Sequence, residues 1–250
     1  MMARPKGSAA AVARSLRIYH GDPGQRAAMD ALYARFVRPG DLAFDIGAHV
    51  GDRISSFRRL GARVVALEPQ PAPARALRLI HGRDPEVTLI EAAAGAAEGH
   101  VELRVNSANP TVSTASEAFL RAADGAAGWE GQAWDGCLTV PCLTLDGLIA
   151  RHGRPAFAKI DVEGFEAAVL AGLSTPLRAL SFEFTTIARD VASECLARLA
   201  GLGSYRFDIA LGETQRLTFG EGVDRDTMAA HLAALPHEAN SGDVYAVLAG

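Results

Sequence analysis

The sequence predicts an α/β protein whose core is a mostly parallel sheet. Two observations support this fold class. From about residue 26 onward, short apolar runs alternate with segments whose apolar residues recur at helical spacing, and glycine or proline usually separates the two. This strand–turn–helix order is typical of parallel βαβ units. The 250 residues, 49% of them hydrophobic, are enough for one such domain and marginal for two, so we expect a single domain over residues 1–250.

The expected strands are short and apolar, as buried strands of a parallel sheet are. They cover residues 42–46, 63–67, 87–90, 156–161, 177–184, 205–211 and 244–248. Apolar residues at helical spacing predict helices between them. These helices cover residues 26–37, 53–60, 72–81, 165–173 and 188–202.

Two segments depart from this order. Residues 106–136 form a long connection, rich in Ser, Thr, Ala and Gly, between two further strand-like runs. A connection of this length is either functional or disordered. We interpret it as a segment inserted on the substrate side, before the fourth parallel strand. Trp129 and Trp134 either stack on a sugar ring or another flat surface, or belong to a disordered surface loop and pack back on the domain. For each tryptophan taken singly, packing on the domain is slightly favoured.

The N-terminal residues 1–25 predict a partly disordered lead-in over 1–17 and either a flap over the ligand or a simple turn at Tyr19 and His20. The lead-in lacks the apolar core of a signal peptide, and the chain has no apolar run of transmembrane length. We therefore expect a soluble, cytoplasmic protein.

Composition excludes several classes of function. The formal net charge of −4 does not favour nucleic-acid binding. The three cysteines lack CxxC spacing, which argues against a disulfide framework or a zinc site. The histidines are scattered as well, so we expect no metal site. The sequence predicts no oligomeric state.

The turn after the first strand, 47–51, lies where open parallel sheets bind ligands. A dinucleotide-binding turn has glycine at its second conserved position, to admit pyrophosphate, whereas this chain has His49 there. Asp45, two residues before Gly47, would repel phosphate and suits a cationic ligand. S-adenosylmethionine, with its ammonium and sulfonium groups, fits this requirement. The alternative is an ordinary βαβ turn whose acids cap helices.

A second acid, Glu68, ends the second strand and is followed by Pro69. An acid at this position accepts hydrogen bonds from ribose hydroxyls. If the first two strands are neighbours, Glu68 lies beside Asp45, and this pair of acids favours S-adenosylmethionine over the ordinary turn.

Further charged residues follow the later strands. Lys159, Asp161 and Glu163 come at the end of the fourth strand, and Glu183 comes at the end of the fifth. Lys159 and Asp161 point the same way if the segment is extended. Such an edge can hold a general base, or it can be an ion-pair network in which Lys159 neutralises buried carboxylates. The three acids also offer oxygen ligands for Mg²⁺, although we expect no metal there.

Four motifs together resemble the FkbM family of methyltransferases. They are Asp45-x-Gly-Ala-His-x-Gly51, Glu68-Pro69, Thr144-Leu145-Asp146 and Lys159-Ile-Asp-Val-Glu-Gly-Phe-Glu166. The resemblance runs from about Leu42 to Glu183. It implies a Rossmann-like sheet of seven strands with an antiparallel last strand and helices on both faces, and S-adenosylmethionine as methyl donor.

The resemblance also implies residue roles. Asp45, Gly47, Ala48 and Gly51 would line the methionine side of the cofactor, Glu68 with Pro69 would hold the ribose, and Asp161 would face the methionine amino group or the transfer site. The acceptor would be a hydroxyl of a sugar, a glycan or a small natural product. The family usually has Asn where this chain has His49, which we interpret as a solvated turn residue.

An alcohol acceptor must lose its proton during methyl transfer, and a carboxylate or histidine can take it. Our candidates are Asp161, Glu183 and His49, in that order. Two other functions remain open from the sequence: a dinucleotide-dependent oxidoreductase, which His49 disfavours, and a non-catalytic binding module, which the intact acids disfavour.

Overall fold

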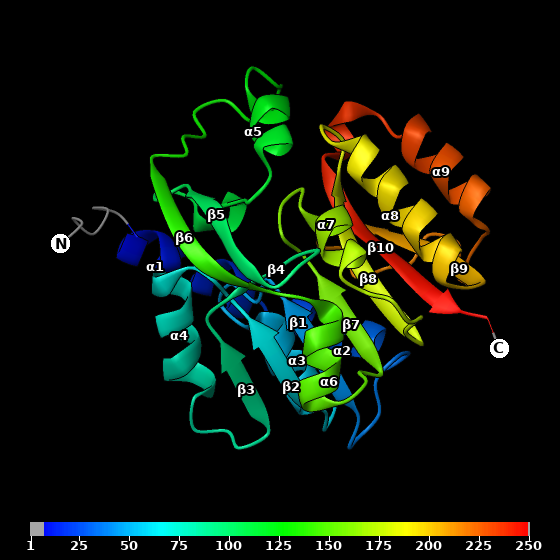
Figure 1. Ribbon diagram of the computed structural model, residues 1–250, viewed down its shortest axis with the longest axis horizontal. Helices are drawn as coiled ribbons and strands as arrows, with labels where there is room; N and C mark the ends of the chain where they lie inside the picture. The colour runs from blue at the N-terminus through cyan, green and yellow to red at the C-terminus, as the bar shows by residue number, and fades with distance from the viewer. Residues whose placement is uncertain (1–7, 250) are drawn as a thin grey trace.

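The computed structural model describes residues 8–249 and contains a seven-stranded sheet of order β3-β2-β1-β7-β8-β10-β9 (Figure 1). All strands run parallel except β10, which is antiparallel to both of its neighbours. The strands are β1 (Leu42–Ile46), β2 (Arg63–Leu67), β3 (Val87–Ile90), β7 (Phe157–Ile160), β8 (Ala179–Thr185), β9 (Tyr205–Leu211) and β10 (Ser241–Leu248). The predicted fold class is confirmed, and all seven predicted strands are present.

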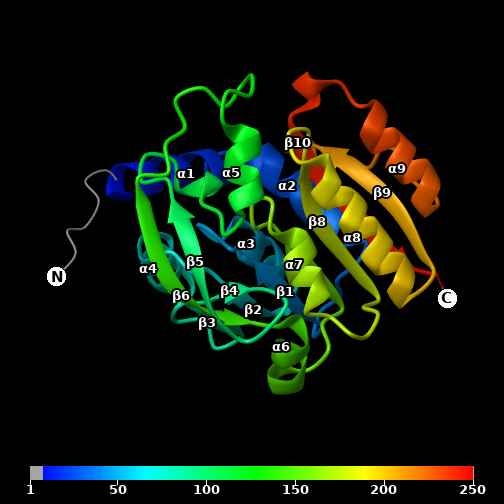
Figure 2. The ribbon, with the colours of Figure 1, turned by 45° about the horizontal axis from the view of Figure 1, so that its top comes forward.

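Helices cover both faces of the sheet (Figures 1 and 2). One apolar core lies between the sheet and α2 (Pro23–Tyr33), α3 (Asp52–Arg59) and α4 (Pro71–His81). The other core lies between the sheet and α6 (Leu145–His152), α7 (Glu166–Ala171), α8 (Arg189–Leu202) and α9 (Arg225–Ala234). A short 3-10 turn, η2 (His237–Ala239), precedes β10.

A second sheet of three strands, order β4-β6-β5, stands apart from the main sheet. It consists of β4 (Ala93–Ala94), β5 (Gly99–Val105) and β6 (Gly136–Leu143), with its own small apolar cluster. We predicted two of these strands but no separate sheet, because the pairing of distant strands leaves no local trace in a sequence. Between β5 and β6, the inserted segment contains η1 (Pro110–Val112) and α5 (Glu117–Ala123), so it is an ordered part of the fold.

The prediction of a partly disordered lead-in over residues 1–17 was wrong where the structure describes it. Residues 8–20 form the helix α1 (Ser8–His20), whereas residues 1–7 lie outside the described part. Ala11, Val12 and Ser15 are buried on one face of α1, and the helix contacts α4 and η1. The apolar spacing in this Ala-rich segment is the signal we overlooked.

Helix α2 also begins earlier than predicted. The carboxylate of Asp22 caps it by accepting hydrogen bonds from the backbone N–H of Gly24 and Gln25, and Pro23 takes the first helical position. This is a common way to begin a helix. Among residues 8–249 we find no helix with the length and apolar character needed to cross a bilayer.

Candidate active site

The carboxyl ends of the central strands open into a cavity of about 330 Å³, the size of a small-molecule site. β1 lies between β2 and β7, and β8 follows β7. This order brings Asp45, Glu68, Asp161 and Glu183 to the same cavity wall, as their positions after or near the strand ends predicted. Residues of η1, α1 and the segment 212–213 complete the lining.

Gly47 is required by the close approach of two loops. Its φ is +88°, and a Cβ atom there would lie 1.8 Å from the carbonyl oxygen of Asp161. The backbone N–H groups of Gly47 and Ala48 both donate to the carbonyl of Leu67. The turn after β1 is therefore held between β2 and the loop after β7, and no larger side chain fits at Gly47.

Gly51 has a different role from the one expected. It does not line the cavity. A Cβ atom there would lie 2.7 Å from Leu77 Cδ2 and 2.8 Å from His81 Nε2, both on α4. Its φ is +81°, so this glycine permits the close packing of the first residues of α3 on α4.

Glu68 supports the same turn from β2. One carboxylate oxygen accepts from the backbone N–H of His49 at 2.9 Å, and the other accepts from that of Gln70 at 2.8 Å. The side chain is 3% exposed, and this burial raises its pKa to about 7. Each oxygen retains a second lone pair for a ligand.

His49 is only partly exposed, whereas we expected a solvated residue. Its Nε2 is hidden from solvent and has no hydrogen-bond partner among residues 8–249. The ring lies edge-on to Tyr19 of α1, at a centroid distance of 5.7 Å. Burial lowers its pKa to about 4, so the imidazole is neutral at neutral pH and is a weak base.

Asp45 is buried at the end of β1 with one oxygen unpartnered. The residue is 2% exposed, and its Oδ2 has no hydrogen-bond partner in the described chain. Burial, with the nearby negative charge of Asp52, raises its pKa to about 7. Buried polar atoms normally find a partner, and a cationic ligand in the cavity would supply one.

The sequence analysis did not identify Arg53, a basic residue next to this site. Arg53 is 8% exposed and lines the cavity. It forms ion pairs with Asp52 and, at 2.9 Å, with Glu213. Arg53 lies in the first turn of a helix, where an arginine normally reaches solvent, and Glu213 is far away in the chain, so no local signal marked this network.

Lys159 forms the ion-pair network that we considered for it. It is 1% exposed, and its Nζ lies 3.0 Å from Asp161 Oδ2 and 2.6 Å from Asp243 Oδ1. Asp243 belongs to β10 and was not predicted. Burial opposes ionisation of Asp161, but Lys159 outweighs it and holds the pKa of Asp161 below its usual range.

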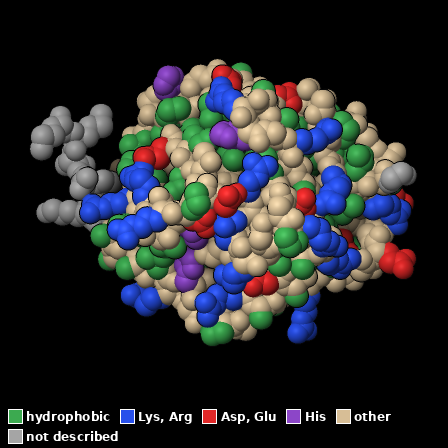
Figure 3. Space-filling view, turned by 90° about the horizontal axis from the view of Figure 1, so that it is seen from below, with side chains coloured by type: hydrophobic (Ala, Val, Ile, Leu, Met, Phe, Trp, Pro, Cys, Tyr) green, Lys and Arg blue, Asp and Glu red, His purple; other side chains and the backbone are tan. Residues whose placement is uncertain are grey.

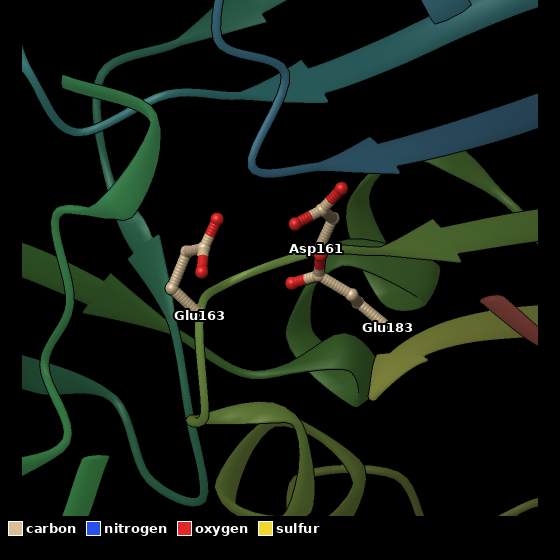
Figure 4. A group of neighbouring side chains, drawn as sticks. All are labelled: Asp161, Glu163 and Glu183. Carbon is tan, nitrogen blue, oxygen red and sulfur yellow. The ribbon is translucent and has the colours of Figure 1, made fainter. Parts of the chain in front are cut away.

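The side chains of Glu163 and Glu183 lie close to that of Asp161 at the cavity wall (Figure 4). One oxygen from each of Asp161, Glu163 and Glu183 lies within 4.8 Å of the other two. Burial and the negative charge of Asp161 raise the pKa of both Glu163 and Glu183 well above the usual value. Asp161 is therefore the member of this group that ionises most readily.

The rest of the Lys159–Glu166 motif holds this group in place. Glu166, 1% exposed, accepts hydrogen bonds from the backbone N–H of Val162 and Gly164. A Cβ atom at Gly164 would lie 2.6 Å from the Phe119 side chain. The motif thus contributes acidic side chains to the cavity, and it forms a tight turn that packs against the inserted segment.

The inserted segment contacts this turn directly. Thr114 donates its hydroxyl to the carbonyl of Glu163 at 2.6 Å. Trp129 and Trp134 pack edge-on against Phe119, and Trp134 Nε1 donates to the carbonyl of Val112. Trp129 also lines the cavity. Both tryptophans therefore pack back on the domain, and Trp129 still reaches the site.

Comparison with known proteins identifies the family. Residues 45–203, more than half of the chain, match the methyltransferase FkbM domain. No curated protein matches the chain. The TehB-like SAM-dependent methyltransferase from Corynebacterium glutamicum is 11% identical, with 94% of each chain covered and a TM-score of 0.47. Precorrin-6y C5,15-methyltransferase from Geobacter metallireducens is 13% identical, with 90% of this chain and 87% of that chain covered and a TM-score of 0.46.

A third solved structure is that of Aeropyrum pernix fibrillarin with natively bound S-adenosyl-L-methionine. It is 12% identical, with 85% of this chain and 68% of that chain covered and a TM-score of 0.43. Likeness at this level says nothing about the acceptor. The family match removes the oxidoreductase and the non-catalytic module that the sequence left open. The chain belongs to the FkbM family of methyltransferases and uses S-adenosylmethionine as its methyl donor.

Proposed function

We propose that the protein methylates a hydroxyl oxygen of a sugar, a glycan or a small natural product. The observation that carries this proposal is the carboxylate of Asp161, which Lys159 keeps ionised at the cavity wall. An alcohol must lose a proton when its oxygen takes the methyl group, and an ionised carboxylate within hydrogen-bonding distance can accept it.

The cofactor is assigned to the part of the cavity between the ends of β1 and β2. The unpartnered oxygen of Asp45 suits the ammonium group of the methionine portion, beside Gly47 and Ala48. The free lone pairs of Glu68 suit the ribose hydroxyls, next to Pro69. We leave Gly51 out of this set because it packs on α4.

The reaction is an in-line displacement at the sulfonium methyl, so the protein must orient the acceptor oxygen and exclude water. Asp161 takes the hydroxyl proton. Glu163 and Glu183, whose pKa values are raised, donate hydrogen bonds to acceptor oxygens or bind a cation. Asp161 is preferred over Glu183 and His49 because it carries a negative charge, which attracts the proton that the hydroxyl loses. Burial raises the pKa of Glu183, which favours its protonated form, and lowers that of His49 to about 4, which keeps the imidazole neutral.

The charge of the cavity limits the acceptor. Eight carboxyl groups but only two basic side chains, Arg53 and Lys159, are among its lining residues. On the face seen in Figure 3, Lys and Arg side chains are scattered and do not form one patch. A phosphate-rich acceptor such as a nucleic acid is disfavoured by the excess of acidic groups in the cavity, whereas a neutral hydroxyl compound that stacks on Trp129 suits it.

The experiment is methyl transfer from ¹³C-methyl S-adenosylmethionine to a panel of glycosides and other alcohols. NMR of the product distinguishes O-methyl from N-methyl carbon. We expect O-methyl products, and in the Asp161→Asn variant a kcat lower by about 10²–10⁴-fold with cofactor affinity retained. An N-methyl product, or a variant that loses only cofactor affinity, would overturn the assignment; in the latter case Asp161 holds the methionine amino group instead.

A further inference from the structure

We propose that Asp161, Glu163 and Glu183 bind a divalent metal ion, Mg²⁺ or Mn²⁺, at the acceptor side of the cavity. Two of these residues follow β7 and the third lies in β8, so the site is built on neighbouring strands of the main sheet. The side chains face a common space (Figure 4). Oxygen ligands of this kind are preferred by Mg²⁺ and Mn²⁺ over softer metals.

The spacing of the three carboxylates fits a single ion. One oxygen from each lies within 4.8 Å of the others. Two oxygens on opposite sides of Mg²⁺ are about 4.2 Å apart, and adjacent ones about 3 Å apart, given metal–oxygen distances of about 2.1 Å. Small side-chain movements therefore bring all three onto one ion and leave positions for water or an acceptor oxygen.

The carboxyl groups of this cluster outnumber the basic side chains that bond to them. Lys159, the basic residue that bonds to Asp161, is shared with Asp243. Neither Glu163 nor Glu183 has an ion-pair partner among residues 8–249. Buried carboxylates without a cation take up protons or bind metal.

A second observation, separate from the spacing of the carboxylates, is that polar groups of this part of the cavity are buried without hydrogen-bond partners, which suggests a ligand. Glu163 is 7% exposed, and the hydrogen bond that it accepts from Thr114 goes to its backbone carbonyl and not to its carboxylate. Oε2 of Glu183 is hidden from solvent without a partner. Thr185, two residues further along β8 and therefore on the same face, is 5% exposed, lines the cavity and has an unpartnered hydroxyl.

When the ion is bound, Asp161 is one of its ligands and is no longer the proton acceptor. The ion would then hold the acceptor oxygen beside the transferable methyl and lower the pKa of its hydroxyl, so that the proton leaves to water. This role rests on the proposed O-methylation, but ion binding itself does not. The competing state is a metal-free cluster, in which the protonated Glu183 hydrogen-bonds to Asp161.

The test measures Mn²⁺ binding from the loss of the electron paramagnetic resonance signal of free Mn²⁺, without cofactor or acceptor. Wild type is compared with the double variant Glu163→Gln/Glu183→Gln. The control Glu102→Gln/Glu221→Gln removes the same charge from two exposed positions. Since Gln resembles a protonated Glu, the double variant should fold, and calorimetry with S-adenosylmethionine verifies this. If it does not fold, Glu163→Gln alone takes its place.

We expect wild type and control to bind one Mn²⁺ that Mg²⁺ displaces, and the double variant to bind it at least about tenfold more weakly. Folded wild type that binds no Mn²⁺, or equal affinity in the double variant, would overturn the inference. O-methylation that persists with a chelator would then leave the proposed function standing. Conversely, Mn²⁺ binding without any methylated alcohol would preserve the ion site and refute the proposed function.

Discussion

Replacing Lys159 by methionine tests the buried ion-pair network most directly. The ammonium group lies 2.6 Å from Asp243 and 3.0 Å from Asp161, and Lys159 is 1% exposed. Methionine fills a similar volume but leaves both carboxylates without this cation. Removing one partner of a buried pair costs about 3–5 kcal/mol. That is a large part of the total of about 5–15 kcal/mol by which a domain is stable.

Urea unfolding followed by circular dichroism measures this loss. The matched control is Arg151→Met, which breaks the pair with Glu98 on the surface, where both side chains are about half exposed. We expect the control to lose at most about 1 kcal/mol. Adding Asp243→Asn to Lys159→Met should recover about 0.5–3 kcal/mol, because one uncompensated charge disappears. A Lys159→Met loss no larger than that of the control, with no recovery in the double variant, would refute this reasoning.

Three further predictions concern the turn after β1 and the inserted segment. Gly47→Ala places a Cβ atom against the Asp161 carbonyl and adds about 1–2 kcal/mol of backbone strain; calorimetry should show S-adenosylmethionine affinity at least about tenfold weaker, and unchanged affinity would contradict the role of this glycine. The pKa of Asp45, raised by burial to about 7 in the folded protein from an ordinary 3.8, means that its stabilising contribution is present at acidic pH and is lost as the pH rises toward 7. Asp45→Asn should therefore flatten the decline in the free energy of unfolding between about pH 4 and about pH 7 in urea titrations, and parallel curves for wild type and variant would contradict this. Thr114→Val leaves the buried carbonyl of Glu163 without its donor, so urea unfolding should show a loss of about 1–3 kcal/mol, whereas Thr139→Val on the exposed face of β6 should change little; equal effects would show that the hydrogen bond is unimportant.

Much of the fold could be predicted because its signals are local. Each strand of the main sheet is a short apolar run bounded by turn residues, and each of the five helices that we predicted has apolar residues at helical spacing. The helices α6 and α9 were not predicted. The positions of Asp45, Glu68 and Asp161 followed from one rule, that parallel strands end at the same edge. To apply this rule, only the neighbouring strands must be known, and βαβ connections usually place consecutive strands next to each other.

The missing parts depend on contacts between distant segments. Arg53 meets Glu213, and Lys159 meets Asp243, at sequence separations that leave no periodic trace. The small second sheet depends on the pairing of β4 with β6 across more than forty residues. The misjudged His49 shows the same limitation, because its burial comes from Tyr19 on α1, a helix that we did not predict.

Helix α1 has a consequence for access to the cavity. It contributes Tyr19 to the cavity wall and is held by a small apolar cluster that includes Val12 and Val50, a hydrogen bond from Arg14 to the carbonyl of Ala108 and one between His20 and the carbonyl of Val50. Segments with so few buried contacts open at low free energy. Because Tyr19 is part of the cavity wall, detachment of this helix would open that wall without unfolding the main sheet.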